Sequence, residues 1–361
     1  MRERVVVAMS GGVDSSTAAG LLQERNYEVI GATMCIGVMD QSREGPARCC
    51  GLADIEDARR VALQLGIPFH VIDLRKEFEE EVINYFCEEY AQGRTPNPCI
   101  LCNEKVKFGS FLEKALELGA DLMATGHYAR LSFDEKTGRA LLRKGVDGRK
   151  DQSYVLFCLT QDQFHHTLFP LGEFRKEKVR QKAFQLGLRV HDKPESQEVC
   201  FIREASYHPF LLERLKRSVE PGPIVDRDGN MLGRHQGIPF YTIGQRRGLR
   251  LAKGKPLYVT RIDREKNAIV VGGEEEVRND TFIVDSVRWI VPPEGIPFHN
   301  AQVKIRYNHP GSEANLSPKG EGGEWVVTFK VAQKAITPGQ AAVFYDGETV
   351  LGGGWIKEVI H

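Results

Sequence analysis

The stretch "VVVAMSGGVDSS", residues 5–16, joins a buried strand, a glycine turn and a helix start. It opens with a continuous apolar run, which is typical of a strand buried on both faces. Ala18, Leu21 and Leu22 then follow at helical spacing. Glycines let the backbone approach a ligand, and the start of a helix attracts phosphate through its unpaired N–H groups and its dipole. The stretch therefore predicts a phosphate-binding loop between a strand and a helix.

The same alternation of strands and helices continues along the first part of the chain. Strands are predicted at 28–34, 68–74 and 121–127, and helices at 55–65, near 76–92, near 105–118 and at 175–187. Residues 129–144 predict a hairpin appended to the sheet. This pattern is typical of an α/β domain, a parallel sheet with helices on both faces.

The later part of the chain has a different pattern. Helical stripes end near residue 215, and residues 256–272 alternate around a turn, as in a small β domain. From residue 282 onward, short alternating runs separated by Gly and Pro predict a small barrel. We expect an α/β catalytic domain at 1–215, a small central β-rich domain at 216–275 and a C-terminal β-barrel at 276–361.

Composition limits the classes of function. Lys plus Arg total 49 and Asp plus Glu also total 49, so a polyanion must be bound by local patches. No apolar run approaches the roughly 20 residues that cross a bilayer, and no signal-peptide core is present. We expect a cytoplasmic protein without membrane contact. The eight cysteines do not form a disulfide framework, so some are expected to carry chemistry.

The loop "SGGVDSS", 10–16, lacks the Lys of GxxxxGK[ST] and the spacing of GxGxxG. It resembles the PP-loop of N-type ATP pyrophosphatases, which cleave ATP between the α and β phosphates and transfer AMP to a substrate oxygen. Serine hydroxyls can donate to phosphate, and Asp14 can support a magnesium ion. This resemblance predicts that a substrate is activated by transfer of AMP, but it does not predict which substrate receives the AMP.

A cysteine pair, Cys99 and Cys102, lies in "TPNPCILCN", 95–103. By itself the pair has three interpretations: half of a zinc site, a redox dithiol or a coincidence. A second pair, Cys49 and Cys50, consists of adjacent residues, which is the wrong spacing for a zinc knuckle. A thioredoxin-like redox dithiol belongs to a different fold.

The surrounding motifs carry a closer resemblance. They are "GRTPNPCILCNEKVKF" (93–108), "ATGHYAR" (124–130), "GRKDQSYVL" (148–156), "SQEVCFI" (196–202), "YTIGQRRGL" (241–249) and "TPGQAAVFYDGE" (337–348). In this order, and with the PP-loop, they resemble the bacterial tRNA-specific 2-thiouridylases over essentially the whole chain. The resemblance implies a PP-loop ATPase domain, a small central tRNA-contacting domain and a β-barrel. It also implies that sulfur is placed on C2 of the wobble uridine, position 34 of certain tRNAs.

The resemblance also implies roles for single residues, with ATP and Mg²⁺ as cofactors and tRNA and a sulfur-donor protein or sulfide source as partners. Cys102 matches the nucleophile and Cys200 the persulfide carrier. ATP would be bound by Ser10, Gly11, Gly12, Val13, Asp14, Ser15, Ser16, Met34 and Gly126. The target base would adjoin Asn97, Pro98 and Cys99, and tRNA would contact His127, Lys150, Asp151, Gln152, Arg306, Tyr307 and Gln340.

One position departs from the family pattern, since the common motif is TPNPDxxC and this chain has Cys99 at the acidic position. A thiolate binds soft metal, so Cys99, Cys102 and Cys200 could ligate a [4Fe–4S] cluster with one iron left to deliver sulfide. In the rival route, a persulfide on Cys200 attacks the adenylated C2, AMP leaves, and Cys102 resolves the product. Both routes require Cys102 and Cys200 to meet in space, and both stay open.

RNA binding by a neutral chain needs local positive charge. "IGQRRGLRLAKGKP", 243–256, predicts an exposed basic loop, which with 174–182 and Arg306 would form a stripe along one side. Two other classes of function also fit part of the chain. A small-molecule synthetase with the same ATP chemistry would leave the cysteines unused, and a metal-stapled RNA-binding module would consume no ATP. Cys35, Cys87 and Cys158 are expected to be core residues.

Overall fold

The computed structural model describes residues 2–37, 52–194, 199–202, 206–215, 219–251, 255–292, 295 and 297–360. The chain divides into two compact units. The first comprises Met1–Val82, Cys99–Phe201 and Glu348–Val350, and the second comprises Ile83–Pro98, Ile202–Gly347 and Leu351–His361. Among the described residues, no helix is both long and apolar enough to span a bilayer.

A five-stranded parallel sheet forms the centre of the first unit, in the order β3-β2-β1-β4-β7. Its strands are β1 (Arg4–Ala8), β2 (Glu28–Cys35), β3 (Phe69–Asp73), β4 (Leu122–Ala124) and β7 (Thr167–Leu168). The predicted strands are confirmed, and Val5, Val6 and Val7 are fully buried. The chain order reverses at β1, and open α/β sheets bind ligands beyond the carboxyl ends of the strands at such a point.

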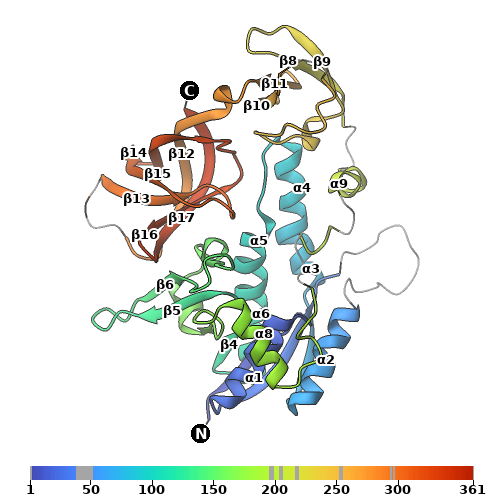
Figure 1. The fold of residues 1–361 in the computed structure, drawn as a ribbon, viewed down its shortest axis with the longest axis vertical. Coiled ribbons are helices and arrows are strands. Elements are labelled where there is room, and N and C mark those ends of the chain that lie inside the picture. The colour runs from blue at the N-terminus through green and yellow to red at the C-terminus, as the bar shows by residue number, and fades with distance from the viewer. Residues whose placement is uncertain are drawn as a thin grey trace. The chain divides into compact units, whose positions relative to one another are not determined.

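Three helices pack with this sheet in one hydrophobic core: α1 (Val13–Glu24), α2 (Leu52–Leu65) and α8 (Lys176–Gln185). The core includes Leu22 of α1, Val61 of α2 and Val179 of α8, all buried. Figure 1 shows α1 and α8 side by side, and their residues are in contact. These helices place the start of α1 at the carboxyl end of β1. Shorter helices of this unit are α3 (Arg75–Phe78), η3 (Ser153–Leu156) and α7 (Gln161–His165).

The helix predicted near 105–118 begins earlier than expected. It consists of α5 (Pro98–Leu101), the π-helical η2 (Cys102–Ser110) and α6 (Phe111–Glu117). In a π-helix the backbone hydrogen bonds join residues five apart in sequence and not four apart. Here Gln163 donates from Nε2 to the carbonyl oxygens of Phe108, at 2.8 Å, and Glu104, at 3.3 Å. Cys99 and Cys102 therefore lie on the helix, and not in the loop before it.

The predicted hairpin is present as β5 (Ala129–Phe133) and β6 (Ala140–Lys144), with Ala129 opposite Lys144. Its predicted attachment to the parallel sheet is wrong, because β7 occupies the sheet edge beside β4. Instead β6 pairs at Arg143 with Thr349, and Arg130 forms a 2.7 Å ion pair with Glu348.

The second unit contains a small antiparallel and parallel sheet in the order β10-β11-β8-β9. The strands of this sheet are β8 (Gly222–Val225), β9 (Met231–His235), β10 (Tyr258–Asp263) and β11 (Ala268–Gly272). The helices of the unit are α4 (Asn84–Ala91) and α9 (His208–Arg214), with the short η4 (Ile238–Phe240) and η5 (Glu275–Val277). Helix α4 continues from the π-helical η1 (Glu79–Ile83). The turn predicted within 256–272 is confirmed by the antiparallel β10–β11 pair.

The predicted C-terminal barrel is also confirmed. Six strands follow the order β12-β15-β14-β13-β16-β17, and β12 pairs with β17 to close the ring (Figure 1). They are β12 (Arg278–Trp289), β13 (Phe298–Lys304), β14 (Ser312–Lys319), β15 (Glu324–Lys334), β16 (Ala341–Asp346) and β17 (Thr349–Ile360). Phe282, Val303 and Phe344 are fully buried in its core. Closure leaves no free sheet edge in this ring.

Candidate active site

The PP-loop after β1 is fixed by its own serines and by α2. The backbone N–H of Ser10 donates to Ser15 Oγ at 3.0 Å, and Ser16 Oγ donates to the Gly12 carbonyl at 2.8 Å. Gly11 has a φ of +71°, and a Cβ there would lie 2.3 Å from the carbonyl oxygen of Asp54. Only glycine fits this position, so the loop can lie directly against the first turn of α2.

The loop after β4 closes onto the PP-loop. A Cβ on Gly126 would lie 2.7 Å from the backbone nitrogen of Ser15, so the two backbones are in contact. Met34 is half-buried near the end of β2, where it pairs with Ile72 of β3. The residues that the resemblance assigns to ATP thus lie at or beyond the carboxyl ends of three adjacent strands, β2, β1 and β4.

Asp14, the second residue of α1, is held by two side chains. Lys176 Nζ donates to both carboxylate oxygens at 2.7 Å, and the Tyr128 hydroxyl donates to Oδ1 at 2.7 Å. Lys176 begins α8 and is buried, with a side chain only 8% exposed. The prediction that 174–182 forms an exposed basic stripe is therefore wrong for Lys176, because its ammonium points inward to a carboxylate.

A second lysine reaches the other side of the loop. Lys193 Nζ donates to the Gly11 carbonyl at 3.1 Å, to Asp54 at 2.8 Å and to Asp57 at 2.7 Å. Partial burial is the largest single influence on the pKa of Lys193 and lowers it. The influences of Asp54 and Asp57 together outweigh burial, so the pKa of Lys193 is raised. Lys193 therefore ties the segment before Cys200 to both the PP-loop and α2.

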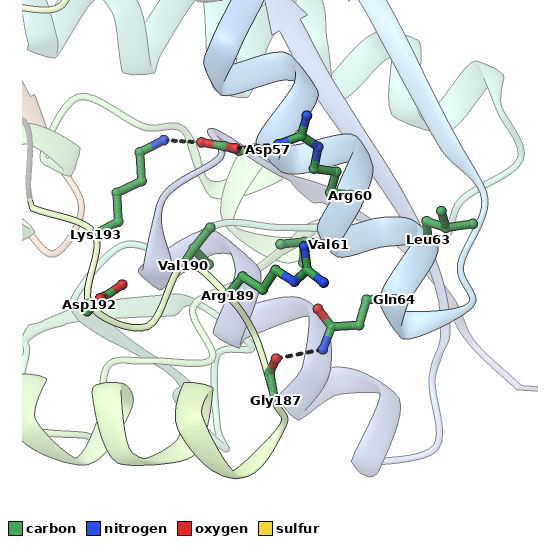
Figure 2. Close-up of a pocket in the computed structure, with 10 residues that line it drawn as sticks. All are labelled: Asp57, Arg60, Val61, Leu63, Gln64, Gly187, Arg189, Val190, Asp192 and Lys193. Atoms are coloured by element: carbon green, nitrogen blue, oxygen red, sulfur yellow. Dashed lines mark hydrogen bonds and ion pairs between the residues drawn. The ribbon is translucent and has the colours of Figure 1, made fainter.

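Figure 2 shows the groove beside this contact, between α2 and residues 187–193, with a volume of about 830 Å³. Lys193 points toward Asp57 on one side of it, and Gln64 donates to the Gly187 carbonyl at 2.7 Å on the other (Figure 2). The groove is lined by Asp57, Arg60, Val61, Leu63, Gln64, Gly187, Arg189, Val190, Asp192 and Lys193. Its charges have both signs, so it has no single electrostatic preference.

Three thiols of the first unit lie in a common electrostatic environment. Cys102 is buried, whereas Cys99 and Cys200 are exposed residues. Removal of water by the surrounding protein raises the pKa of each, even where part of the residue is exposed, and raises that of Cys200 to about 12. Negative charge on Cys102 or Cys99 would raise the pKa of Cys200 further. All three groups are thus neutral thiols at neutral pH.

One cation opposes this effect at all three thiols. The ammonium of Lys107 lowers the pKa of Cys99, Cys102 and Cys200, although burial has the larger influence on each. Its Nζ donates to Asn103 Oδ1 at 3.1 Å, and Asn103 Nδ2 donates to the Val155 carbonyl at 2.9 Å. Asn103 therefore holds Lys107 where it can favour a thiolate.

With the side chains in these positions, neither the predicted cluster site at the three cysteines nor the predicted magnesium site at Asp14 is assembled. Within the ranges that the structure describes, no three His, Cys, Asp or Glu side chains gather closely enough to hold a metal ion. The three thiols therefore do not fit a cluster in this arrangement, and Asp14 has both oxygens engaged by Lys176. Of the cysteines expected in the core, all three are buried: Cys87 and Cys158 are thiols, while Cys35 is disulfide-bonded.

His127 is a buried histidine in the loop after β4. Its Nδ1 pairs with Thr125 Oγ1 at 2.7 Å, and its ring packs against those of Phe108 and Phe169, which also contact each other. Burial, and secondly the charge of Lys107, lowers its pKa well below the ordinary value. His127 is therefore neutral, and it joins the loop after β4 to helix η2.

The Lys-Asp-Gln motif at 150–152 uses two of its side chains inside the protein. Asp151 is buried and accepts from Gly145 N and from Ser153 N and Oγ, at 3.0 to 3.1 Å. Gln152 Oε1 accepts from Tyr128 N at 3.0 Å, and Gln152 N donates to the Tyr128 carbonyl at 2.9 Å. Lys150 is half-buried. Asp151 and Gln152 thus shape the loop that presents Lys150.

In the second unit, the predicted tRNA residues occupy two places. Gln340 Nε2 donates to the carbonyl oxygens of Thr95, at 2.9 Å, and Pro96, at 3.3 Å, directly before Asn97. Arg306 is exposed and donates to the Lys334 carbonyl, and Tyr307 is 37% exposed. In the predicted basic loop, Arg246, Arg247, Arg250 and Lys255 are exposed, while Lys253 lies outside the described residues.

Sequence reasoning missed Lys176, Lys193 and Tyr128 as partners of the PP-loop. Tyr128 lies within the motif at 124–130, Lys176 lies within the basic segment 174–182, and Lys193 precedes the motif at 196–202, but nothing in the local pattern shows which way each side chain points. The only available signal was negative, since the loop itself has no lysine.

The parallel sheet, its switch point and the glycine loop define an α/β domain with the PP-loop, ATP-binding type of fold. A family model described as "tRNA methyl transferase HUP domain" matches residues 3–204. Models described as "tRNA methyl transferase PRC-barrel domain" and "Aminomethyltransferase beta-barrel domain" match residues 208–273 and 279–356.

Curated relatives extend over the whole chain. The tRNA-specific 2-thiouridylase MnmA of Halothermothrix orenii is 51% identical over 99% of both chains. That of Heliobacterium modesticaldum is 51% identical over 99% of this chain and 93% of the relative. This chain belongs to the tRNA-specific 2-thiouridylase family. A solved structure, a predicted subunit of tRNA methyltransferase from Methanocaldococcus jannaschii, overlaps at a TM-score of only 0.30, with 20% identity, and the match covers 51% of this chain and 76% of that one.

Proposed function

We propose that this protein uses ATP to replace the C2 oxygen of the wobble uridine of tRNA with sulfur, forming 2-thiouridine. Membership of the thiouridylase family supports the substrate and the product. In the first step, the C2 oxygen attacks the α-phosphate of ATP, and pyrophosphate leaves. The adenylated oxygen is then a good leaving group, as AMP.

One structural observation carries the proposal. The loop after β4 contacts the PP-loop through Gly126 and contacts helix η2 through His127 and Phe108. Helix η2 begins at Cys102 and carries Lys107, whose charge reaches Cys99, Cys102 and Cys200. Contacts thus link the predicted site of ATP cleavage to helix η2, which begins at Cys102, and the charge of Lys107 on this helix acts on three thiols of the same unit.

The thiols support a persulfide route for the sulfur step. The terminal sulfur of a Cys200 persulfide attacks C2, and AMP departs with the original oxygen. Cys102 Sγ then attacks Cys200 Sγ and breaks the bond between Cys200 Sγ and the sulfur on C2. The C2=S group forms, and a Cys102–Cys200 disulfide remains. An external dithiol restores both thiols, and a sulfur-donor protein or sulfide source reloads Cys200. We place this reaction in the cytoplasm, with Mg²⁺ entering alongside ATP.

The function is tested with purified protein, ATP, Mg²⁺, a persulfide donor and unmodified tRNA. Wild-type protein is expected to form AMP, pyrophosphate and thiouridine in a tRNA-dependent manner. Asp14→Ala is expected to abolish AMP formation, whereas Cys200→Ser retains AMP formation and makes no thiouridine. Cys87→Ala, at a buried cysteine of the other unit, serves as the control. AMP formed without tRNA in the presence of an amino acid would instead indicate a small-molecule synthetase.

Iron, zinc and acid-labile sulfide analysis after anaerobic purification separates the two sulfur routes. The persulfide route requires full thiolation by protein without iron. Thiouridine formation that appears only after cluster reconstitution would contradict it.

A further inference from the structure

The PP-loop contains no lysine, although ATP brings several negative charges to it. The structure supplies a cation from elsewhere: Lys176, 162 residues after Asp14 in sequence, donates to both oxygens of its carboxylate. An ammonium group this deeply buried is costly unless it is paired, so its position at the loop requires a specific partner.

Lys176 is fixed at its backbone as well as at its side chain. Its N–H donates to Asp147 Oδ2 at 3.1 Å, and it is the first residue of α8. The ring of Tyr128 lies 5.7 Å from its Nζ, and the hydroxyl of the same tyrosine donates to Asp14. Groups of the protein itself therefore hold the ammonium beside the loop, which reduces the ordering that nucleotide binding requires.

The backbone of Ser15, next to Asp14, faces Gly126 across a contact that leaves no room for a side chain. Asp14 and Lys176 thus lie at the point where the two strand-end loops of the switch crevice meet. Phosphate oxygens bound by the N–H groups at the start of α1 would lie within the range of this charge pair. Without Lys176, the carboxylate of Asp14 would repel them.

We propose that Lys176 is a positioning residue of the adenylation step: it orients and neutralises Asp14 and provides the positive charge that the PP-loop itself lacks for the phosphates of ATP. This inference rests on the proposed function, since it assumes that ATP is the nucleotide consumed. Lys176 acts on the phosphate part of the nucleotide and not on adenosine.

The test compares Lys176→Met, Lys176→Arg and the matched control Lys182→Met. Lys182 lies on the same helix and also reaches α1, through a 2.8 Å ion pair with Glu24, but at the end remote from the loop. Binding of ATP, pyrophosphate and adenosine is measured by calorimetry without tRNA, together with the Tm of each variant.

Lys176→Met is expected to weaken ATP and pyrophosphate binding by about tenfold or more, the size of a lost charge-assisted contact. Adenosine binding and Tm stay close to wild type, Lys176→Arg regains most of the affinity, and Lys182→Met loses none. Wild-type pyrophosphate affinity in Lys176→Met would overturn the proposal. So would a joint loss of ATP binding, adenosine binding and Tm, which would indicate a purely structural ion pair.

These outcomes are separate from those of the proposed function. Wild-type protein that binds ATP yet forms no AMP with tRNA would contradict the function, while the comparison of pyrophosphate affinities would still decide the role of Lys176.

Discussion

Gln340 donates a hydrogen bond from Nε2 to the carbonyl oxygen of Thr95, 2.9 Å away and 245 residues earlier in the chain. The same turn makes two further contacts with this segment. Thr95 N donates to the Pro338 carbonyl at 2.9 Å, and Gly339, at a φ of +90°, approaches Thr95 so closely that a Cβ would lie 2.9 Å from its nitrogen. The turn at 337–340 therefore supports the segment that precedes Asn97 and Pro98.

We predict that Gln340→Ala raises the KM for tRNA several-fold and leaves ATP affinity unchanged. A lost hydrogen bond of about 1 kcal/mol corresponds to roughly fivefold, and the loosened segment carries the residues expected beside the target base. Steady-state thiolation at varied tRNA measures the effect. Gln333→Ala, in strand β15, is the control, and an unchanged KM in Gln340→Ala would refute this supporting role.

Gly126→Ala is expected to weaken ATP binding by more than tenfold. The added methyl group would lie 2.7 Å from Ser15 N and 2.9 Å from the Asp14 carbonyl carbon, so the PP-loop must shift. Gly148→Ala is the matched control, because a Cβ there meets nothing within 4 Å. Calorimetry with ATP measures both variants, and equal affinities would show that the loop accommodates the methyl group.

Lys107→Met is expected to slow alkylation of Cys200 at every pH below the pKa of its thiol. Removing the ammonium removes an influence that lowers this pKa, so the pKa rises from about 12 and the thiolate fraction falls. Iodoacetamide labelling between pH 7 and 10, followed by mass spectrometry, gives the rate. Lys105→Met, which changes a more exposed lysine of the same helix, should label like wild type. Identical pH profiles for Lys107→Met and wild type would show that Lys107 does not act on the thiol.

Buried His127 is expected to make the fold less stable as the pH falls below about 6.5. The folded protein keeps this ring neutral, because its pKa is lowered by burial, whereas the unfolded chain takes up a proton at the ordinary pKa. Each further pH unit contributes up to about 1.4 kcal/mol against folding. His127→Asn should therefore lose less Tm than wild type between pH 7.5 and 5, while His299→Asn, at an exposed residue, should follow wild type. Parallel Tm curves for His127→Asn and wild type would contradict the assignment.

Periodicity predicted the strands and the closed barrel because burial of apolar side chains sets both. The start of the cysteine helix was missed because two prolines indicate a turn, yet Pro98 occupies the first helical position, which needs no N–H donor. The hairpin at 129–144 was recognised, but alternation along a strand does not tell which sheet it joins.

The candidate site was predictable where a motif contains its own chemistry, as in the PP-loop. It was not predictable where the partner is distant. Lys176 looks like one more charge on a solvated helix until the fold turns it toward Asp14. His127 likewise gave no sign that its ring would pack against those of Phe108 and Phe169.

The distant lysines also affect when this site can form during synthesis. Translation makes the PP-loop before either lysine, because Lys176 and Lys193 follow the residues they hold by 162 and 182 positions. At about 5 to 20 residues per second, translation leaves the loop without these cations for roughly ten to forty seconds. A nascent chain stalled before Lys176 would carry the complete loop sequence but neither of its cations.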